Sequence, residues 1–188
     1  MKVYLQSIGC RLNQSEIETM ARQLLAAGHE IVDNTAVADK VIINTCAVTA
    51  EAARDGRTLT RRIHRQNETA EIILTGCYAT IAPAELGRVQ GAGRIVANQD
   101  KAQLVTLLDP QARIDLPIFD QEPVLREFLA GTTGNTRAFV KVQDGCNNKC
   151  TFCVTTIARG AGQSRHLGDV VAEIQALTAA GYQEAVLT

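Results

Sequence analysis

Three closely spaced cysteines are the residues of this sequence best suited to chemistry. Cys146, Cys150 and Cys153 are four and three positions apart, so a single tight loop can direct three thiolates at one centre. Iron–sulfur clusters are usually held by four cysteines, but no fourth cysteine follows these three in the chain. We expect these loop cysteines to hold a cluster that leaves one position open, as a catalytic zinc site does for its substrate. A structural zinc loop with its fourth ligand elsewhere is the alternative.

The remaining three cysteines occupy equivalent places in an alternating pattern. Cys10, Cys46 and Cys77 each follow a predicted strand by one to three residues. Ligands of parallel sheets bind beyond the carboxyl ends of the strands, so these strand-end cysteines would meet at that edge. A single free cysteine is most often a small buried apolar residue, but that role explains three equivalent positions poorly. The pattern favours a second three-cysteine metal site.

The elements that position these cysteines alternate between strands and helices. Apolar runs predict strands at residues 3–8, 41–43, 72–74 and 95–96. A first helix is expected to begin at a capping box of Ser15 and Glu18 and to stop at Gly28. Later helices are expected at residues 49–67, 83–89 and 99–108. Fully apolar strands alternating with helices predict an α/β fold whose parallel sheet is covered on both faces.

The sequence divides into three segments. Residues 1–108 form the first α/β domain, and residues 109–136 read as a proline-containing linker with a short helix near 124–129. Residues 137–188 contain a strand at 136–142, a helix at 168–180 and a strand at 185–188, with the loop cysteines after the first strand. One βαβ unit cannot cover its own sheet or close a barrel. We therefore expect a chain cut inside a second α/β domain, inactive by itself and incompletely folded beyond Arg137.

Composition excludes several classes of protein. The chain has 188 residues, 46% of them apolar, and a net charge of −1, so it can bury a core but has no overall attraction to nucleic acid. It shows no long uncharged apolar run and no signal peptide, which predicts a cytoplasmic protein with no membrane partner. In that compartment the six cysteines are expected to be reduced ligands rather than disulfides.

The loop cysteines, with the aromatic Phe152 before the last of them, resemble the cluster loop of radical S-adenosylmethionine (SAM) enzymes. Adding the strand-end cysteines makes the layout similar to the radical SAM methylthiotransferase family. Local matches lie at residues 9–16, 44–51, 75–79, 144–153, 158–160 and 164–165. The forms around Cys10 and Cys46 are most similar to members that act on tRNA threonylcarbamoyladenosine. Thr156 and Gln163 depart from the common family pattern, at positions that are not ligands.

The resemblance implies a fold, two cofactors and a reaction. The fold would be a flavodoxin-like α/β domain followed by the beginning of a partial radical SAM (β/α) barrel. Each set of three cysteines would hold a 4Fe–4S cluster, and Phe152, Arg159 and Arg165 would lie near SAM, with no catalytic residue beyond the cluster ligands. The product would be a methylthio group at C2 of the modified adenosine next to the anticodon. Implied partners are tRNA, a protein electron donor and a sulfur donor.

Several alternatives remain open at this stage. Relatives that modify isopentenyl-adenosine in tRNA or an aspartate of a ribosomal protein share the layout, and a non-catalytic RNA-binding module stapled by metal would share the cysteines. A thiol redox protein is the weakest reading. Phe152 could equally pack in a core, and Arg159 and Arg165 could meet tRNA phosphate. One helix stripe suits either phosphate contact or plain solvation, and it comprises Arg54, Arg57, Arg61 and Arg65.

Overall fold

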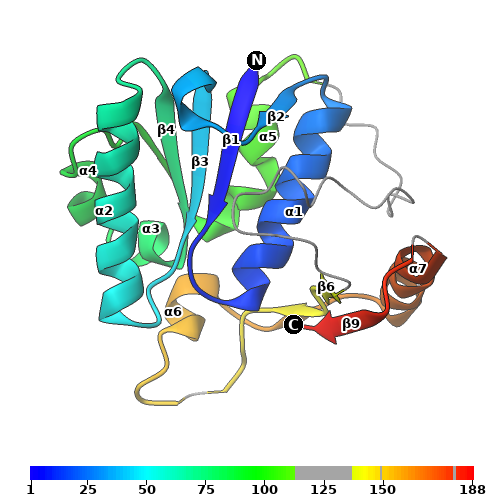
Figure 1. The fold of residues 1–188 in the computed structure, drawn as a ribbon. Helices are drawn as coiled ribbons and strands as arrows, with labels where there is room; N and C mark the ends of the chain where they lie inside the picture. Colours follow the sequence, from blue (N-terminus) through cyan, green and yellow to red (C-terminus); the bar gives the residue numbers. More distant parts are fainter. Residues whose placement is uncertain (113–136, 149, 180) are drawn as a thin grey trace.

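The chain was analysed as a computed structural model, which describes residues 1–112, 137–148, 150–179 and 181–188. Its largest element is a five-stranded parallel sheet in the order β2-β1-β3-β4-β5 (Figure 1). The strands are β1 (Lys2–Ser7), β2 (Glu30–Val32), β3 (Lys40–Thr45), β4 (Glu71–Gly76) and β5 (Arg94–Val96). This order is that of flavodoxin-like folds, so the predicted α/β class and parallel sheet are confirmed.

Helices cover both faces of the sheet (Figure 1). On one face α1 (Arg11–Ala26) and α5 (Leu104–Leu108) pack on alternate strand residues that include Leu5, Ile42 and Ile73. On the other face α2 (Ala50–Gln66), α3 (Cys77–Ile81) and α4 (Pro83–Gly87) pack on the intervening residues. Two apolar cores therefore bury both faces of the sheet, as expected for parallel strands.

The helix ends agree with the sequence in part. Thr49 caps α2 as predicted, because its hydroxyl accepts a hydrogen bond from the Ala52 amide at 3.1 Å. Gly28 ends α1 with φ +78°, and the amide of His29 donates to the Leu24 carbonyl at 2.9 Å, as in a Schellman motif. The predicted capping box of Ser15 and Glu18 is wrong. The helix already begins at Arg11 with Cys10 as its N-cap, since the turn at residue 9 leads directly from β1 into it.

Other elements differ from the prediction in ways that depend on tertiary packing. Strand β2 was not expected, because three residues give too short a pattern, and it forms by pairing with β1. The helix expected at residues 99–108 is a 3₁₀ helix, η2 (Asn98–Gln103), followed by α5. A second 3₁₀ helix, η1 (Thr35–Val37), precedes β3.

Residues beyond 136 form a small second region at the carboxyl ends of the sheet strands (Figure 1). Strands β6 (Arg137–Val140) and β9 (Glu184–Leu187) pair in parallel, with α7 (Leu167–Ala179) between them in the chain, as the predicted βαβ unit requires. The loop cysteines lie between the short antiparallel strands β7 (Gln143–Asp144) and β8 (Gln163–Ser164), just before α6 (Thr155–Arg159).

The expected linker and its short helix at residues 124–129 lie almost wholly outside the described residues. Among the helices that the structure does describe, none combines the length and apolar character needed to cross a lipid bilayer.

Candidate functional site

The strand-end cysteines lie together at the carboxyl edge of the sheet. Thr45 pairs with Gly76 in the β3–β4 register, so Cys46 and Cys77 follow adjacent strand ends directly. Gly9 has φ +102°, and a Cβ atom there would lie only 2.3 Å from the Cβ of Cys46. Glycine is therefore required at this close approach, which brings the segment containing Cys10 against Cys46. The prediction that these residues share one edge agrees with this arrangement.

Polar groups hydrogen-bond to the sulfur atoms of these cysteines. The Val48 amide donates to Cys46 Sγ at 3.5 Å, and Asn98 Nδ2 donates to Cys77 Sγ at 3.7 Å. The Cys10 thiol donates to Asn13 Oδ1 at 3.7 Å. Hydrogen bonds to sulfur stabilise thiolates and tune the potentials of iron–sulfur clusters.

The loop cysteines are held by a closed turn. Gly145 has φ +66°, and a Cβ atom there would lie 2.3 Å from the Ala161 carbonyl oxygen, so the two sides of the loop touch. The Cys146 amide donates to the Gly160 carbonyl at 3.2 Å, and the Asn148 amide donates to Cys146 Sγ at 3.4 Å. A hydrogen bond from the Thr155 hydroxyl, helped by backbone amides of the same turn, lowers the pKa of the Cys153 thiol.

The donor set fits two three-cysteine iron–sulfur sites in its chemistry. All six cysteines are free, and one sulfur or more in each set accepts an amide hydrogen bond. Within the described residues, however, no three Cys, His, Asp or Glu side chains already converge as a ligand shell. The backbone thus places the strand-end cysteines at one edge of the sheet and the loop cysteines between β7 and β8.

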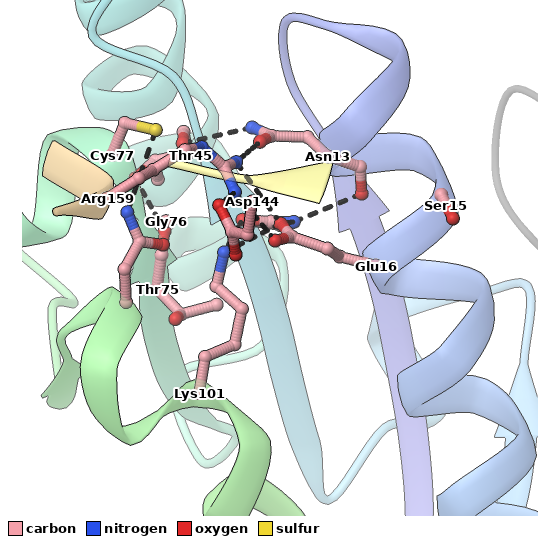
Figure 2. A network of polar contacts seen from close by, with 12 residues as sticks. Asn13, Ser15, Glu16, Thr45, Thr75, Gly76, Cys77, Lys101, Asp144 and Arg159 are labelled. Carbon is pink, nitrogen blue, oxygen red and sulfur yellow. Dashed lines mark hydrogen bonds and ion pairs between the residues drawn. The ribbon is translucent and has the colours of Figure 1, made fainter. Parts of the chain in front are cut away.

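A buried charge network lies beside Cys77 (Figure 2). Arg159 Nη1 is 2.8 Å from Glu16 Oε1 and 2.9 Å from Asp144 Oδ1. The other oxygen of Glu16 lies 2.7 Å from Lys101 Nζ and accepts a hydrogen bond from Asn44 Nδ2 at 3.1 Å. We call Glu16, Lys101, Asp144 and Arg159 the Arg159 cluster; Lys141 lies at its margin, 2.7 Å from Asp144.

The opposite charges of the Arg159 cluster keep Glu16 and Arg159 ionised despite their burial. Burial alone would raise the pKa of Glu16, but Lys101 and Arg159 hold it well below its usual range. Burial would lower the pKa of Arg159, yet its bonds to Glu16 and Asp144 raise it above the ordinary value. Both side chains are therefore charged at neutral pH, although Arg159 is 3% exposed and Glu16 is 6% exposed.

The three residues expected near SAM lie in different surroundings. Phe152, within the cysteine loop, is 90% exposed. Arg165 pairs with Glu173 and donates to the Lys141 carbonyl at 2.9 Å, while Arg159 is enclosed in its cluster. Arg159 and Arg165 both line a cavity of about 630 Å³ between α1, η2 and β8, and Phe152 does not.

The arginine stripe of α2 divides into two kinds of residue. Arg57 hydrogen-bonds to the Tyr78 hydroxyl, lies over its ring and pairs with Glu85 at 2.9 Å. Arg54, Arg61 and Arg65 are exposed to solvent. Three members of the stripe therefore remain available to an external partner.

Sequence reasoning missed Glu16 and Lys101 as partners of Arg159. One signal was present, since Asn13 and Glu16 fall at helical spacing on the same face as the apolar Ile17 and Met20, and all four are buried. Polar side chains on the core face of a helix indicate buried partners. The identity of those partners depends on contacts between distant segments.

The sequence is similar to a family model and to several curated proteins. Residues 2–98 match the family model described as "Uncharacterized protein family UPF0004". Threonylcarbamoyladenosine tRNA methylthiotransferase MtaB of Bacillus subtilis is 36% identical over 99% of the chain and 43% of its own length, and MtaB of Aquifex aeolicus is 34% identical over 100% and 47%. Ribosomal protein uS12 methylthiotransferase RimO of Chloroflexus aurantiacus is 30% identical over 100% and 46%.

The chain thus spans less than half the length of these curated relatives. The family model covers more than half of the chain, and the relatives that align along nearly all of it are methylthiotransferases. This chain belongs to the UPF0004 family.

Proposed function

We propose that this chain is part of a tRNA methylthiotransferase that inserts a methylthio group at C2 of N6-threonylcarbamoyladenosine next to the anticodon. The observation that carries the proposal is the placement of the strand-end cysteines at the carboxyl ends of β1, β3 and β4, with α6, which follows the loop cysteines in the chain, lying at the same edge of the sheet (Figure 1). The similarity to MtaB proteins supports this substrate.

The spacing of the cysteines indicates which of them would hold each cluster. The loop cysteines would hold one 4Fe–4S cluster and the strand-end cysteines a second, each with three protein ligands. When bound, these clusters would supply one-electron cleavage of SAM and a place to hold the sulfur that is inserted. The closed β7–β8 turn would keep the loop thiolates in register, and the sulfur-directed amides would stabilise their charge.

The remaining site residues have proposed roles in binding. Phe152 is large, apolar and exposed, so it is available to pack on the adenine of SAM. Arg165, and Arg159 if it exchanges a partner, would bind a carboxylate or phosphate at the edge of the cavity. Arg54, Arg61 and Arg65 would contact tRNA phosphates, because positive side chains on one helix face position a nucleic acid backbone. An electron donor and a sulfur donor complete the proposed partners.

The proposed domain division is 1–108 for the sheet domain, 109–136 for a linker and 137–188 for the beginning of a radical SAM partial barrel. The β6–α7–β9 unit supports the last assignment, since a barrel of this class is built from successive βαβ units.

The test uses full-length protein reconstituted without oxygen. We expect about eight irons per chain with matching sulfide, falling to about four when Cys10, Cys46 and Cys77 are all replaced by alanine. Zinc alone would overturn the proposal. About four irons in both the wild type and the triple variant would show that the strand-end cysteines hold no cluster.

Nucleoside analysis then identifies the substrate. A strain lacking the gene should lose the methylthio form of threonylcarbamoyladenosine from its tRNA and regain it on complementation. Loss of methylthio-isopentenyl-adenosine, or of the modified ribosomal aspartate, would instead place the protein with the other relatives in this family, which include a tRNA-2-methylthio-N(6)-dimethylallyladenosine synthase and RimO.

A further inference from the structure

The Arg159 cluster joins the two regions of the chain through charged contacts. Glu16 on α1 and Lys101 on η2 belong to the sheet region, whereas Asp144 on β7 and Arg159 on α6 belong to the second region (Figure 2). Arg159 reaches across with both terminal nitrogens, because Nη1 binds Glu16 at 2.8 Å and Nη2 binds Asn13 Oδ1 at 2.8 Å. The guanidinium is therefore held in one orientation by partners from both regions.

The charged side chains of this contact are buried, so the loss of one partner would be costly. The side chains of Arg159, Glu16 and Lys101 are 3%, 6% and 8% exposed. A buried ion pair gains little over apolar packing, but removing one partner leaves an uncompensated charge and is strongly unfavourable. Hydrogen bonds between an arginine and carboxylates are directional, because the planar guanidinium donates from fixed positions. The cluster therefore specifies how the second region is placed on the sheet edge.

Arg159 lies one contact away from both sets of cysteines. On its own side, Gly160 accepts the Cys146 amide at 3.2 Å. On the sheet side, Asn13 accepts from both Arg159 and the Cys10 thiol, and Asn98 donates to both the Ala158 carbonyl at 2.6 Å and Cys77 Sγ at 3.7 Å. A movement of Arg159 would therefore disturb hydrogen bonds next to both sets of cysteines.

We infer that Arg159 is a positioning residue: with Glu16 and Asp144 it sets the placement of the loop cysteines relative to the strand-end cysteines, and its positive charge lies next to the strand-end cysteines through Asn13, which accepts hydrogen bonds from both Arg159 and the Cys10 thiol. The docking role depends on the described contacts alone. The role of the charge rests on the proposed function, because it requires a cluster at the strand-end cysteines.

The docking role is tested by hydrogen–deuterium exchange on the full-length protein without iron. Arg159→Gln and Glu16→Gln should each speed exchange of residues 144–160 by roughly tenfold or more. The first removes the charged contacts that cross between the regions, and the second leaves the buried Lys101 without an acidic partner. The double variant should be no faster than the worse single variant, since the two residues act as one pair. Amides of β3 and β4 should keep their protection, which shows that the sheet remains folded.

The matched control is Arg137→Gln, which removes an exposed ion pair with Glu184 inside the second region, where the two atoms are 2.6 Å apart. It should leave exchange of residues 144–160 unchanged. Arg159→Lys keeps the charge and one contact, so it should restore part of the protection. Unchanged exchange in Arg159→Gln, or strictly additive effects in the double variant, would overturn the docking role.

The charge role is tested by the reduction potential of the cluster at the strand-end cysteines, measured by electron paramagnetic resonance in protein whose loop cysteines are alanine. Arg159→Gln should shift this potential to more negative values, because a positive charge that favours the reduced cluster is lost. Arg159→Lys should recover most of the shift, and Arg137→Gln should show none. An unshifted potential would overturn the charge role, whereas failure to bind iron would overturn the proposed function and leave the exchange result to decide docking.

Discussion

The two regions of this molecule are stabilised in different ways. The sheet region buries two apolar cores on opposite faces of five strands. The second region pairs two parallel strands and leaves large apolar side chains in solvent, among them Ile157 at 74%, Leu167 at 75% and Leu187 at 58% exposure. The first region therefore holds its cysteines by apolar packing on both faces of the sheet. The second region buries fewer apolar side chains, such as Val140 and Ala158, and adds charged contacts with the first.

The largest expected effect lies in the sheet core. Ile42 is fully buried in the central strands, so Ile42→Ala should lower the free energy of unfolding by about 2–5 kcal/mol. Leu187→Ala in the second region should cost less than about 1 kcal/mol, because most of that side chain is already exposed. Native-state hydrogen exchange at β3 amides measures both. Equal losses for the two variants would break the comparison.

Acid should weaken the junction of the two regions. The folded pKa of Glu16 is below its unfolded value, because Lys101 and Arg159 outweigh the opposing effect of burial, so its contribution is present above about pH 4.3 and is lost as pH falls further. The free energy of unfolding of the wild type should exceed that of Glu16→Gln by ~2 kcal/mol at pH 7. This difference should disappear below pH ~4. Unfolding curves across that range provide the measurement. A gap that stays constant with pH would contradict it.

Two glycines beside the cysteines sharpen the comparison. Gly9→Ala would force a Cβ against Cys46 at positive φ, and it should cost about 1–3 kcal/mol of sheet stability. Gly145→Ala has a similar clash with the Ala161 carbonyl, but it should increase exchange only in the cysteine loop, because the sheet does not depend on that turn. Gly28→Ala, with positive φ and nothing within 4 Å, is the control for the strain alone.

The smallest effect on stability is expected on the exposed face of α2. Arg61→Gln and Arg65→Gln should change stability by less than about 0.5 kcal/mol, since both side chains are in solvent. If they contact tRNA, each should weaken binding and reduce its salt dependence by about one unit of slope. Arg57→Gln, which also loses Tyr78 and Glu85, should lower stability more. Binding titrations at several salt concentrations distinguish these outcomes.

Local patterns predicted the parallel sheet and the placement of the strand-end cysteines at its carboxyl edge. The apolar runs at residues 41–43 and 72–74 were sufficient for β3 and β4, and Thr49 was sufficient for the start of α2. Strand β2 depends on a neighbour, and α3 and α6 are single turns next to cysteines, so periodicity does not detect them.

The Arg159 cluster shows the same limit at the candidate site. Glu16 and Arg159 are 143 positions apart, and nothing local to either one indicates the other. The polar residues on the core face of α1 indicated that some buried partner exists, while its identity required the three-dimensional arrangement.

Asn98 shares one side-chain amide between the Cys77 sulfur and the Ala158 carbonyl. Ligation of that sulfur and docking of α6 therefore draw on the same donor, so the two processes are thermodynamically linked. Any change in the docking equilibrium caused by a ligand at Cys77 must be matched by an equal change in ligand affinity when α6 docks. Binding of a cofactor at the strand-end cysteines would then change the position of the loop cysteines, and the reverse, through the side-chain amide of Asn98.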